Sequence, residues 1–258
     1  MKVEHTCKIL AKEVLGSGAV AMTLGVGDMV RTDRMGPGKF IHIQCGGASL
    51  LRRPISVCAW SVGRERDDTL TVVFETRGEG TAWLARRPVG HMLDVLGPLG
   101  NGFDVELGTY LLVGGGIGVP PMLSCAGYTG GTSTAILGFR SRDKAILLDE
   151  FAGECAQVQI ATDDGSLGHH GFVDELVRRE LEKQSYRAVL ACGPRPMLKS
   201  VARAAAAFGV PCQVSMEERM GCGVGACLVC ATPMRDGTVK HVCKDGPVFR
   251  AEEVDWDA

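Results

Sequence analysis

The chain has 258 residues, of which 45% are hydrophobic and 22% charged, and its formal net charge is −2. This length suits about two domains and a smaller module, and the composition is ordinary for a globular protein. Basic and acidic residues are mixed along the chain without a basic stripe, so we expect no nucleic-acid partner. The N-terminus has no apolar signal core, and glycines and prolines interrupt the most apolar stretch, so we expect no signal peptide and no membrane span. With no export signal, the eleven cysteines favour a reducing, cytoplasmic location.

The first hundred residues predict β structure. Residues 40–45 partly alternate between apolar and polar, and residues 69–76 are rich in β-branched and aromatic side chains. Gly-Pro steps such as Gly97-Pro98 separate these runs, which favours an antiparallel barrel over residues 1–104. We expect a short helix after Gly80, with Thr81 as its cap.

The pattern changes near residue 108. Apolar runs then alternate with helical segments: runs at 110–113, 134–139 and 188–192, helices at 173–182 and 196–208. Continuous apolar strands alternating with helices predict a parallel sheet covered on both faces, here over residues 105–212. A Cys- and Gly-rich segment then predicts a small domain at 213–258. The expected fold is therefore a multidomain chain of a β-barrel, an α/β domain and this module.

Four cysteines near the C-terminus have a distinctive spacing. Cys222-x4-Cys227-x2-Cys230, followed after twelve intervening residues by Cys243, matches the loop by which plant-type ferredoxins hold a [2Fe–2S] cluster. Glycines that allow close backbone approach adjoin the first ligands: Gly221, Gly223 and Gly225. A structural zinc site is the alternative, but zinc ribbons usually have two C-x2-C knuckles and this segment has one. The spacing therefore favours one-electron transfer.

The other seven cysteines lack ligand spacing, and we expect buried thiols that behave as small hydrophobic residues. They are Cys7, Cys45, Cys58, Cys125, Cys155, Cys192 and Cys212.

A glycine-rich loop follows the first strand of the α/β domain. It reads Gly114-Gly115-Gly116-Ile117-Gly118-Val119-Pro120-Pro121 and should open a helix whose N–H groups face a pyrophosphate. It departs from the G-x-G-x-x-G fingerprint, so a mere tight connection is the alternative. Cys192-Gly193-Pro194 follows a later strand at the same expected sheet edge, which favours a dinucleotide site.

Several polar features have simpler interpretations. Asp163-Asp164-Gly165-Ser166 with His169-His170-Gly171 looks like a metal site at first sight, but it matches no ligand spacing and contains good turn chemistry. We expect a loop beside the nucleotide. The remaining histidines are isolated and are expected to be structural or solvated: His5, His42, His91 and His241. The chain has no nucleophile elbow and no P-loop, so its chemistry should belong to bound cofactors.

Six stretches together carry a family resemblance. They are Arg53-Pro54-Ile55-Ser56, Gly78-Glu79-Gly80-Thr81 and residues 94–103, 112–121, 216–223 and 243–249. In this order they resemble the ferredoxin–NAD(P)+ reductase superfamily over the whole chain. Within that superfamily, the chain is most similar to the electron-transfer (iron–sulfur flavoprotein) subunits of NAD-dependent class 1B dihydroorotate dehydrogenases.

The resemblance implies FAD on the barrel. Arg53 would face the FAD pyrophosphate, since a guanidinium fork suits phosphate oxygens, and Ser56 would lie near flavin N5. The rest of the implied site is Pro54, Ile55, Val73, Phe74, Glu75, Gly80 and Thr81. Relatives often carry a basic residue where Glu75 stands. We therefore expect Glu75 to point away from the pyrophosphate or to contact FAD only through its backbone.

The resemblance also implies NAD in the α/β domain. The implied contacts are Gly114, Gly115, Gly116, Gly118, Asp163, Cys192, Gly193 and Pro194. A 2′-phosphate of NADP would need basic residues, which Arg140 and Arg142 could supply. Asp163 and Asp164 would disfavour that phosphate, and the family favours NAD.

The implied partner is an FMN-containing catalytic subunit that oxidises dihydroorotate for pyrimidine biosynthesis, in a heterotetramer of two copies of each chain. Electrons would pass from FMN through the [2Fe–2S] cluster, held by Cys222, Cys227, Cys230 and Cys243, and through FAD to NAD+. No catalytic residue for dihydroorotate is expected in this chain. One alternative is the small flavin and iron–sulfur subunit of an NADPH-linked ferredoxin or sulfide reductase. Another is a binding module with structural zinc, which leaves the barrel and the glycine-rich loop unexplained.

Overall fold

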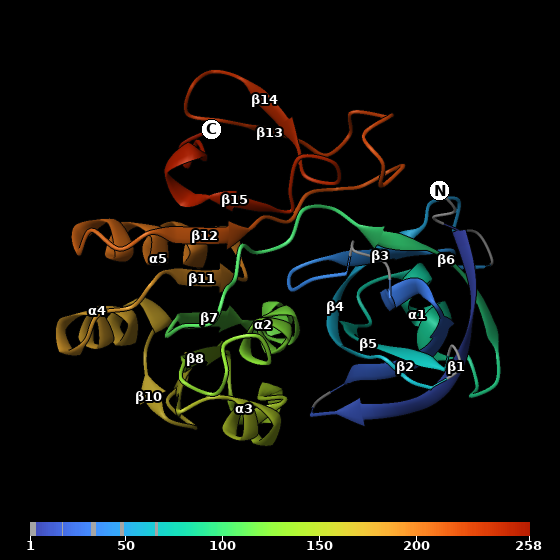
Figure 1. Ribbon diagram of the computed structural model, residues 1–258, viewed down its shortest axis with the longest axis horizontal. Helices are drawn as coiled ribbons and strands as arrows, with labels where there is room; N and C mark the ends of the chain where they lie inside the picture. The colour runs from blue at the N-terminus through green and yellow to red at the C-terminus, as the bar shows by residue number, and fades with distance from the viewer. Residues whose placement is uncertain (1–3, 17, 32–34, 47–48, 65–66) are drawn as a thin grey trace.

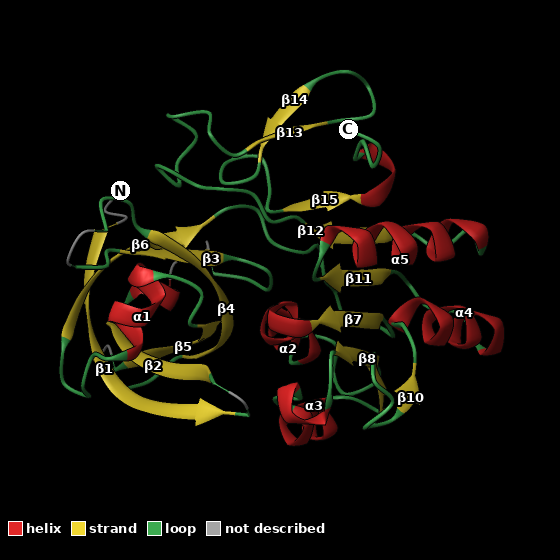
Figure 2. Ribbon diagram, turned by 180° about the vertical axis from the view of Figure 1, so that it is seen from behind, coloured by secondary structure: helices red, strands yellow, loops and turns green. Residues whose placement is uncertain are grey.

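The computed structural model describes residues 4–16, 18–31, 35–46, 49–64 and 67–258. The N-terminal barrel lies beside an α/β domain, and the C-terminal segment extends over both (Figure 1). Figure 2 shows the same arrangement from behind, with the C-terminal loops next to β3 and β6 of the barrel.

The barrel closes through six antiparallel strands in the order β1-β2-β5-β4-β3-β6. The strands are β1 (Glu4–Leu15), β2 (Ala19–Gly27), β3 (Phe40–Ile43), β4 (Arg53–Ser61), β5 (Asp68–Glu75) and β6 (Met92–Leu99). Inward-facing apolar residues such as Ile9, Met22 and Leu70 fill its interior. The predicted antiparallel barrel is confirmed, and the two predicted β runs correspond to β3 and β5.

One helix, α1 (Glu79–Ala85), follows β5. The expectation that Thr81 caps it is wrong, because the helix begins at Glu79 and its N-cap is Gly78, three residues before Thr81. Thr81 is instead the third helical residue, and its hydroxyl oxygen accepts hydrogen bonds from the backbone N–H groups of Arg77 and Gly78, at 3.0 and 3.2 Å. A polar side chain at this position can reach back to the cap, so Thr81 still stabilises the start of the helix.

The α/β domain is built on a seven-stranded sheet in the order β10-β9-β8-β7-β11-β12-β15. Its strands are β7 (Leu111–Gly115), β8 (Thr134–Phe139), β9 (Gln157–Thr162), β10 (His169–His170), β11 (Val189–Cys192), β12 (Cys212–Ser215) and β15 (Val248–Arg250). All neighbours are parallel except the last pair, β12 and β15. The helices are α2 (Val119–Ala126), α3 (Leu148–Glu154), α4 (Val173–Lys183) and α5 (Arg195–Ala207).

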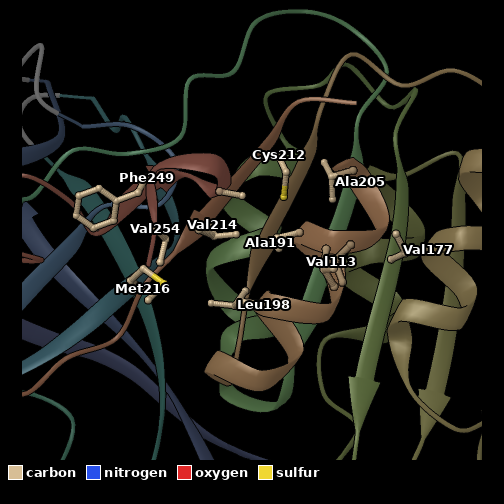
Figure 3. Close-up of a cluster of buried hydrophobic side chains, with 14 of the residues drawn as sticks. Val113, Val177, Ala191, Leu198, Ala205, Cys212, Val214, Met216, Phe249 and Val254 are labelled. Atoms are coloured by element: carbon tan, nitrogen blue, oxygen red, sulfur yellow. The ribbon is translucent and has the colours of Figure 1, made fainter. Parts of the chain in front are cut away.

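Helices cover both faces of this sheet, as predicted. Along β7, Val113 packs with α4 and α5 on one face, whereas Leu112 packs with α2 and α3 on the other. This alternation is the ordinary consequence of successive strand side chains pointing to opposite faces. Figure 3 shows part of the first core, where Val113 lies between Val177 of α4 and Leu198 of α5.

The C-terminal segment is attached to the α/β domain. Besides β15 it contains the hairpin of β13 (Ala231–Pro233) and β14 (Val239–His241). Phe249 and Val254 extend the core that continues under α5, and Met216 lies beside them (Figure 3). The boundary expected at residue 213 falls inside β12, and the domain limits remain a prediction. Among the helices of the described residues, none is long and apolar enough for a bilayer crossing.

Candidate functional site

The loop from Cys222 to Cys230 directs backbone N–H groups at sulfur atoms. The Cys222 sulfur accepts from the N–H groups of Val224, Ala226 and Cys227 at 3.4, 3.2 and 3.4 Å. Burial by itself would raise the pKa of the Cys222 thiol, but these hydrogen bonds outweigh it and lower the pKa to about 6. The loop therefore favours an anionic sulfur, which is the form that binds metals.

The four predicted ligands come together as two pairs. The N–H of Cys222 donates to the sulfur of Cys227 at 3.3 Å, and the N–H of Cys243 donates to the sulfur of Cys230 at 3.4 Å. The N–H of Gly225 links the pairs by donating to the sulfur of Cys243 at 3.1 Å. Burial, reinforced by the neighbouring Cys230, raises the pKa of Cys243 to about 12. Holding all the thiolates together therefore requires a positively charged centre.

This donor set fits a [2Fe–2S] cluster, in which each iron takes two protein thiolates and the sulfur atoms accept hydrogen bonds. Among the described residues, no group of three or more His, Cys, Asp or Glu side chains is arranged to hold a single metal ion. The assignment of the cysteines as ligands remains a prediction, which their paired arrangement supports.

Two glycines allow this loop to form. Gly223 and Gly225 have φ angles of +75° and +81°, a region that side-chain-bearing residues rarely adopt. A Cβ at Gly223 would lie 2.5 Å from Nδ1 of His42, and one at Gly225 would lie 2.6 Å from the Lys244 side chain. The loop is therefore closely packed on the barrel and on its own later segment.

His42 is a residue whose role the sequence does not indicate. It was expected to be structural or solvated, and it proves to be completely buried under the cysteine loop. Burial lowers its pKa, and nearby backbone groups of Arg52 and Cys222 oppose that shift. An outward-facing strand position would ordinarily be exposed, so only the C-terminal segment above it explains this burial.

The expected FAD residues lie mainly on β4 and the turn before α1. A Cβ at Gly80 would be 2.6 Å from Nε of Arg53, so the absence of a side chain allows α1 to pack against this guanidinium. Neighbouring Arg52 binds both carboxylate oxygens of Asp94 at 3.0 and 2.9 Å and so fixes the start of β4 against β6. The structure thus brings Arg53 and Gly80 together at one end of the barrel.

Three further expected FAD residues have buried side chains. Ile55, Val73 and Phe74 are 6%, 3% and 4% exposed and belong to hydrophobic cores. Any contact they make with a cofactor would therefore be through the backbone or the edge of the side chain.

Glu75 is paired within its own turn. Its carboxylate accepts a hydrogen bond of 2.9 Å from Nε of Arg77, two residues further on. The sequence comparison identified the unusual carboxylate but not this arginine. The ion pair offsets the repulsion that a carboxylate would otherwise exert on a pyrophosphate.

The glycine-rich loop packs directly on the Cys192-Gly193-Pro194 turn. Gly114 of β7 pairs with Cys192 of β11 in the parallel register. A Cβ at Gly118 would lie 2.4 Å from the carbonyl oxygen of Cys192, so these two backbones touch. In contrast, Gly116 has φ +54° with no heavy atom within 4 Å of its missing Cβ, and it leaves its side of the loop open.

This loop leads into α2, whose first turn has no side-chain cap. This turn offers few donors, because Pro120 and Pro121 have no backbone N–H and the N–H of Val119 donates to the carbonyl of Gly116. The open backbone at Gly116, and not the first turn of the helix, is therefore the part of this loop that suits a phosphate.

Asp163 lies two strands away along the same sheet edge. It follows β9, the strand beyond β8, and its backbone N–H donates to the carbonyl of Phe139 at 3.1 Å. Asp164 is engaged elsewhere, because its carboxylate accepts from the N–H and hydroxyl of Ser166. Arg142 is tied to the same turn through a 3.0 Å hydrogen bond to the Ser166 carbonyl. Of the two aspartates, Asp163 is therefore the candidate for a ribose contact.

The Cys192 thiol is not a nucleophile at neutral pH. Burial raises its pKa to about 12, against the smaller opposing effect of a hydrogen bond with Ser215. The nucleophilic form of cysteine is the thiolate, so Cys192 can only shape the site by packing.

An antiparallel barrel, a parallel α/β domain with a glycine-rich loop and a four-cysteine segment together define a ferredoxin reductase-like protein with an iron–sulfur domain. Solved structures agree with this class. An NADH-dependent reduced ferredoxin–NADP oxidoreductase superimposes with a TM-score of 0.86 at 30% identity, covering 97% of this chain and 90% of that one. The ferredoxin reductase of carbazole 1,9a-dioxygenase shares the fold, with a TM-score of 0.65 at 20% identity over 81% of this chain and 66% of that one.

Residues 217–255 match the family model for the iron–sulfur cluster binding domain of dihydroorotate dehydrogenase B. The electron transfer subunit of dihydroorotate dehydrogenase B (NAD(+)) from Bacillus caldolyticus is 39% identical over 95% of this chain and 96% of its own length. The corresponding subunit from Geobacillus thermodenitrificans is 42% identical over 84% of this chain and 86% of its own length. The chain belongs to this family of electron transfer subunits, and the resemblance inferred from its motifs is confirmed.

Proposed function

We propose that this chain carries electrons from the FMN of a dihydroorotate-oxidising catalytic subunit to NAD+, through a [2Fe–2S] cluster and FAD, in pyrimidine biosynthesis. The observation that carries the proposal is the two pairs of cysteines packed on the barrel, within a chain of this family. The NADPH-linked reductase alternative is weaker, because its structural relative is 30% identical whereas the dihydroorotate dehydrogenase relatives reach 43%.

When bound, FAD supplies hydride exchange with NAD and single-electron exchange with the cluster. In the barrel, Arg53 binds the FAD pyrophosphate, and Gly80 allows the backbone before α1 to approach the same group. Ser56 faces outward from β4, since its neighbours Ile55 and Val57 point into the barrel core, and its hydroxyl hydrogen-bonds the reacting edge of the flavin. Pro54 flanks the flavin ring, and Thr81 stabilises the turn before α1. The site is completed by the backbone of Val73, Phe74 and Glu75.

In the α/β domain, the backbone N–H groups from Gly114 to Gly118 bind the NAD pyrophosphate at the start of α2. Gly116 is the open member of this loop, whereas Gly115 packs on Met197 and Pro194 and contributes only its backbone. Cys192, Gly193 and Pro194 orient the nicotinamide from the adjacent strand end, and Asp163 accepts from a ribose hydroxyl. A 2′-phosphate would be repelled by Asp163, which supports NAD over NADP.

The exposed face of the cysteine loop is the docking site for the catalytic subunit. Val224, Leu228 and Val229 are 49%, 59% and 55% exposed there. Leu228 also has a positive φ of 60°, an unfavourable conformation for leucine that places an apolar side chain at the surface. Exposed apolar groups gathered around a redox centre are typical of a protein–protein contact.

Assembly with two copies of each chain belongs to this proposal. So does a cytoplasmic location, which the absence of disulfides among the eleven cysteines supports.

The test is co-expression with the catalytic subunit and assay of dihydroorotate-dependent NAD+ reduction. Leu228→Asp should abolish co-purification and this coupled activity while the chain keeps its oxidation of NADH by an artificial acceptor. Aspartate tolerates a positive φ better than leucine, so the loop itself should not be strained. The matched control is Leu107→Asp, an exposed leucine (79%) away from the cysteine loop, which should change neither property. Full coupled activity in Leu228→Asp would refute the docking site, and a chain without flavin or iron would refute the whole proposal.

A further inference from the structure

His42 faces outward from the barrel, on the face where the flavin is proposed to bind. Its neighbours Ile41 and Ile43 point into the barrel core, so alternation directs His42 and Phe40 to the outside. Across the strand pair, Phe40 lies opposite Ser56 and His42 opposite Pro54. His42 is thus one position along the outer face from the pair containing Ser56.

The cysteine loop covers the imidazole ring from above. The backbone at Gly223 approaches so closely that a Cβ there would lie 2.5 Å from Nδ1. The ring is 0% exposed although it belongs to an outward-facing position. His42 therefore lies between the barrel face and the loop that begins at Cys222.

Neither ring nitrogen of His42 has a hydrogen-bond partner among the described residues. In either protonation state an imidazole carries at least one N–H donor. A buried donor without an acceptor is unfavourable, and such groups in native proteins usually have a partner that is a ligand or water. Backbone carbonyls of Arg52 and Cys222 lie near the ring but outside hydrogen-bond geometry. The other acceptors that the cysteine loop brings to this side are sulfur atoms, since Gly223, next to Cys222, lies directly against Nδ1.

We propose that His42 is a positioning residue that donates its ring N–H to a sulfur atom of the bound cluster or of its thiolates, and so raises the reduction potential of the cluster. This inference rests on the proposed function, because it requires the [2Fe–2S] cluster. A hydrogen bond to sulfur stabilises the reduced cluster more than the oxidised one, since the reduced form carries the additional negative charge.

The experiment compares two variants of the intact, cofactor-loaded chain by redox titration with EPR detection of the reduced cluster. His42→Leu fills most of the space without a donor, whereas His42→Asn retains an N–H near the Nδ1 position. In His42→Leu the ratio of reduced to oxidised cluster at a given potential should fall about tenfold, equivalent to about 59 mV for one electron. His42→Asn should restore most of the shift. His91→Leu removes another barrel histidine and should leave the potential unchanged.

An unchanged potential in His42→Leu, with iron and flavin content intact, would overturn the proposal. So would an equal fall in His42→Leu and His42→Asn, because loss of shape alone would then explain the effect. A wild-type chain with no [2Fe–2S] signal would instead refute the proposed function itself.

If neither variant assembles a cluster, the proposal is tested on the wild-type protein instead. Pulsed EPR of the reduced cluster with isotopically labelled histidine should detect coupling to a ring nitrogen. The coupling should persist in His241→Gln, which removes the histidine nearest to Cys243 in the chain. Absence of any histidine coupling in the wild type would overturn the proposal.

Discussion

The side chain of Asn101 donates a hydrogen bond of 3.1 Å to the backbone carbonyl of Lys244, next to the predicted ligand Cys243. A second bond of the same length reaches the carbonyl of Asp245. Asn101 follows β6, so a single amide connects the end of the flavin barrel to the turn that carries Cys243. The separation between the barrel and the cysteine site is therefore fixed by hydrogen bonds as well as by packing.

Asn101→Ala should leave the cluster in place but slow its reduction by the flavin. The loss of two hydrogen bonds should also lower the free energy of unfolding by about 1–3 kcal/mol, measured by urea denaturation. Gln213→Ala is the matched control, because the Gln213 amide also makes two bonds, to the backbone N–H and carbonyl of Asp104. It should cost similar stability without altering cluster reduction in stopped-flow measurements. Equal rates in both variants would show that Asn101 only stabilises the fold.

Cys227→Ser should remove the cluster and leave the flavin half-reaction intact. Cys227 is the exposed member of the first thiol pair, so its loss should deprive one iron of a ligand without disturbing a core. Iron content and the EPR signal should fall to background, while NADH still reduces FAD. Cys155→Ser, which alters a partly exposed thiol outside the loop, should retain both. A full [2Fe–2S] signal in Cys227→Ser would show that the ligand assignment is wrong.

Gly118→Ala should weaken nucleotide binding selectively. Its methyl group would lie 2.4 Å from the carbonyl oxygen of Cys192, so the glycine-rich loop must separate from the neighbouring turn. Overpacking of this kind costs about 1–3 kcal/mol, and the KM for NADH should rise by about tenfold or more. FAD and iron content should not change. Gly153→Ala is the control, since a Cβ there meets no atom within 4 Å, and wild-type kinetics are expected. A normal KM in Gly118→Ala would argue against this loop as the nucleotide site.

Because of Glu180, the stability of the α/β domain should vary with pH in the acid range. The residue is 1% exposed, and its carboxylate accepts hydrogen bonds from Gln159, Lys183 and Tyr186. Burial raises its pKa, but these hydrogen bonds outweigh it and lower the pKa from the ordinary value of 4.5. A carboxyl with a lowered folded-state pKa stabilises the fold fully above 4.5, and this contribution is lost as pH falls through the lower value.

Glu180→Gln should therefore destabilise the protein by about 1–3 kcal/mol at neutral pH. The difference from wild type should shrink as the pH is lowered below the ordinary carboxyl range. Glu182→Gln, at an exposed position on the same helix, should be within about 0.5 kcal/mol of wild type throughout. A destabilisation of Glu180→Gln that does not vary with pH would mean that the ionised carboxylate has no special role.

The sequence predicts those parts of this molecule that depend on local spacing. The intervals between Cys222, Cys227 and Cys230 determine which thiols share a loop. In the structure Cys222 lies against Cys227, and the role of these cysteines as ligands remains a prediction. The run from Gly114 to Gly118 likewise predicts a tight strand-to-helix turn. Each of these patterns is local, because the residues that specify it are neighbours in the chain.

The features that could not be predicted depend on contacts between distant segments. His42 looks like any isolated histidine until the cysteine loop, some 180 residues later, is placed over it. Helix α1 begins earlier in the structure than the sequence predicts, because Gly78, and not Thr81, provides the extended residue before the helix. The partner of Glu75 was missed because an arginine two residues away along a turn has no recognisable periodicity.

The pairing of β15 with β12 has a consequence for how this protein can operate. Because the chain returns from the cysteine segment into the sheet of the nucleotide domain, the cysteine segment is anchored at both ends and is not a carrier on a flexible tether. The centre cannot swing between donor and acceptor, so the catalytic subunit must come to it. Removing the segment would also uncover the edge of β12, and an uncovered edge strand invites pairing with other chains. Electron delivery and the integrity of the nucleotide domain are thus inseparable in this chain, and a shortened version should aggregate before it could serve as a simple NADH–flavin reductase.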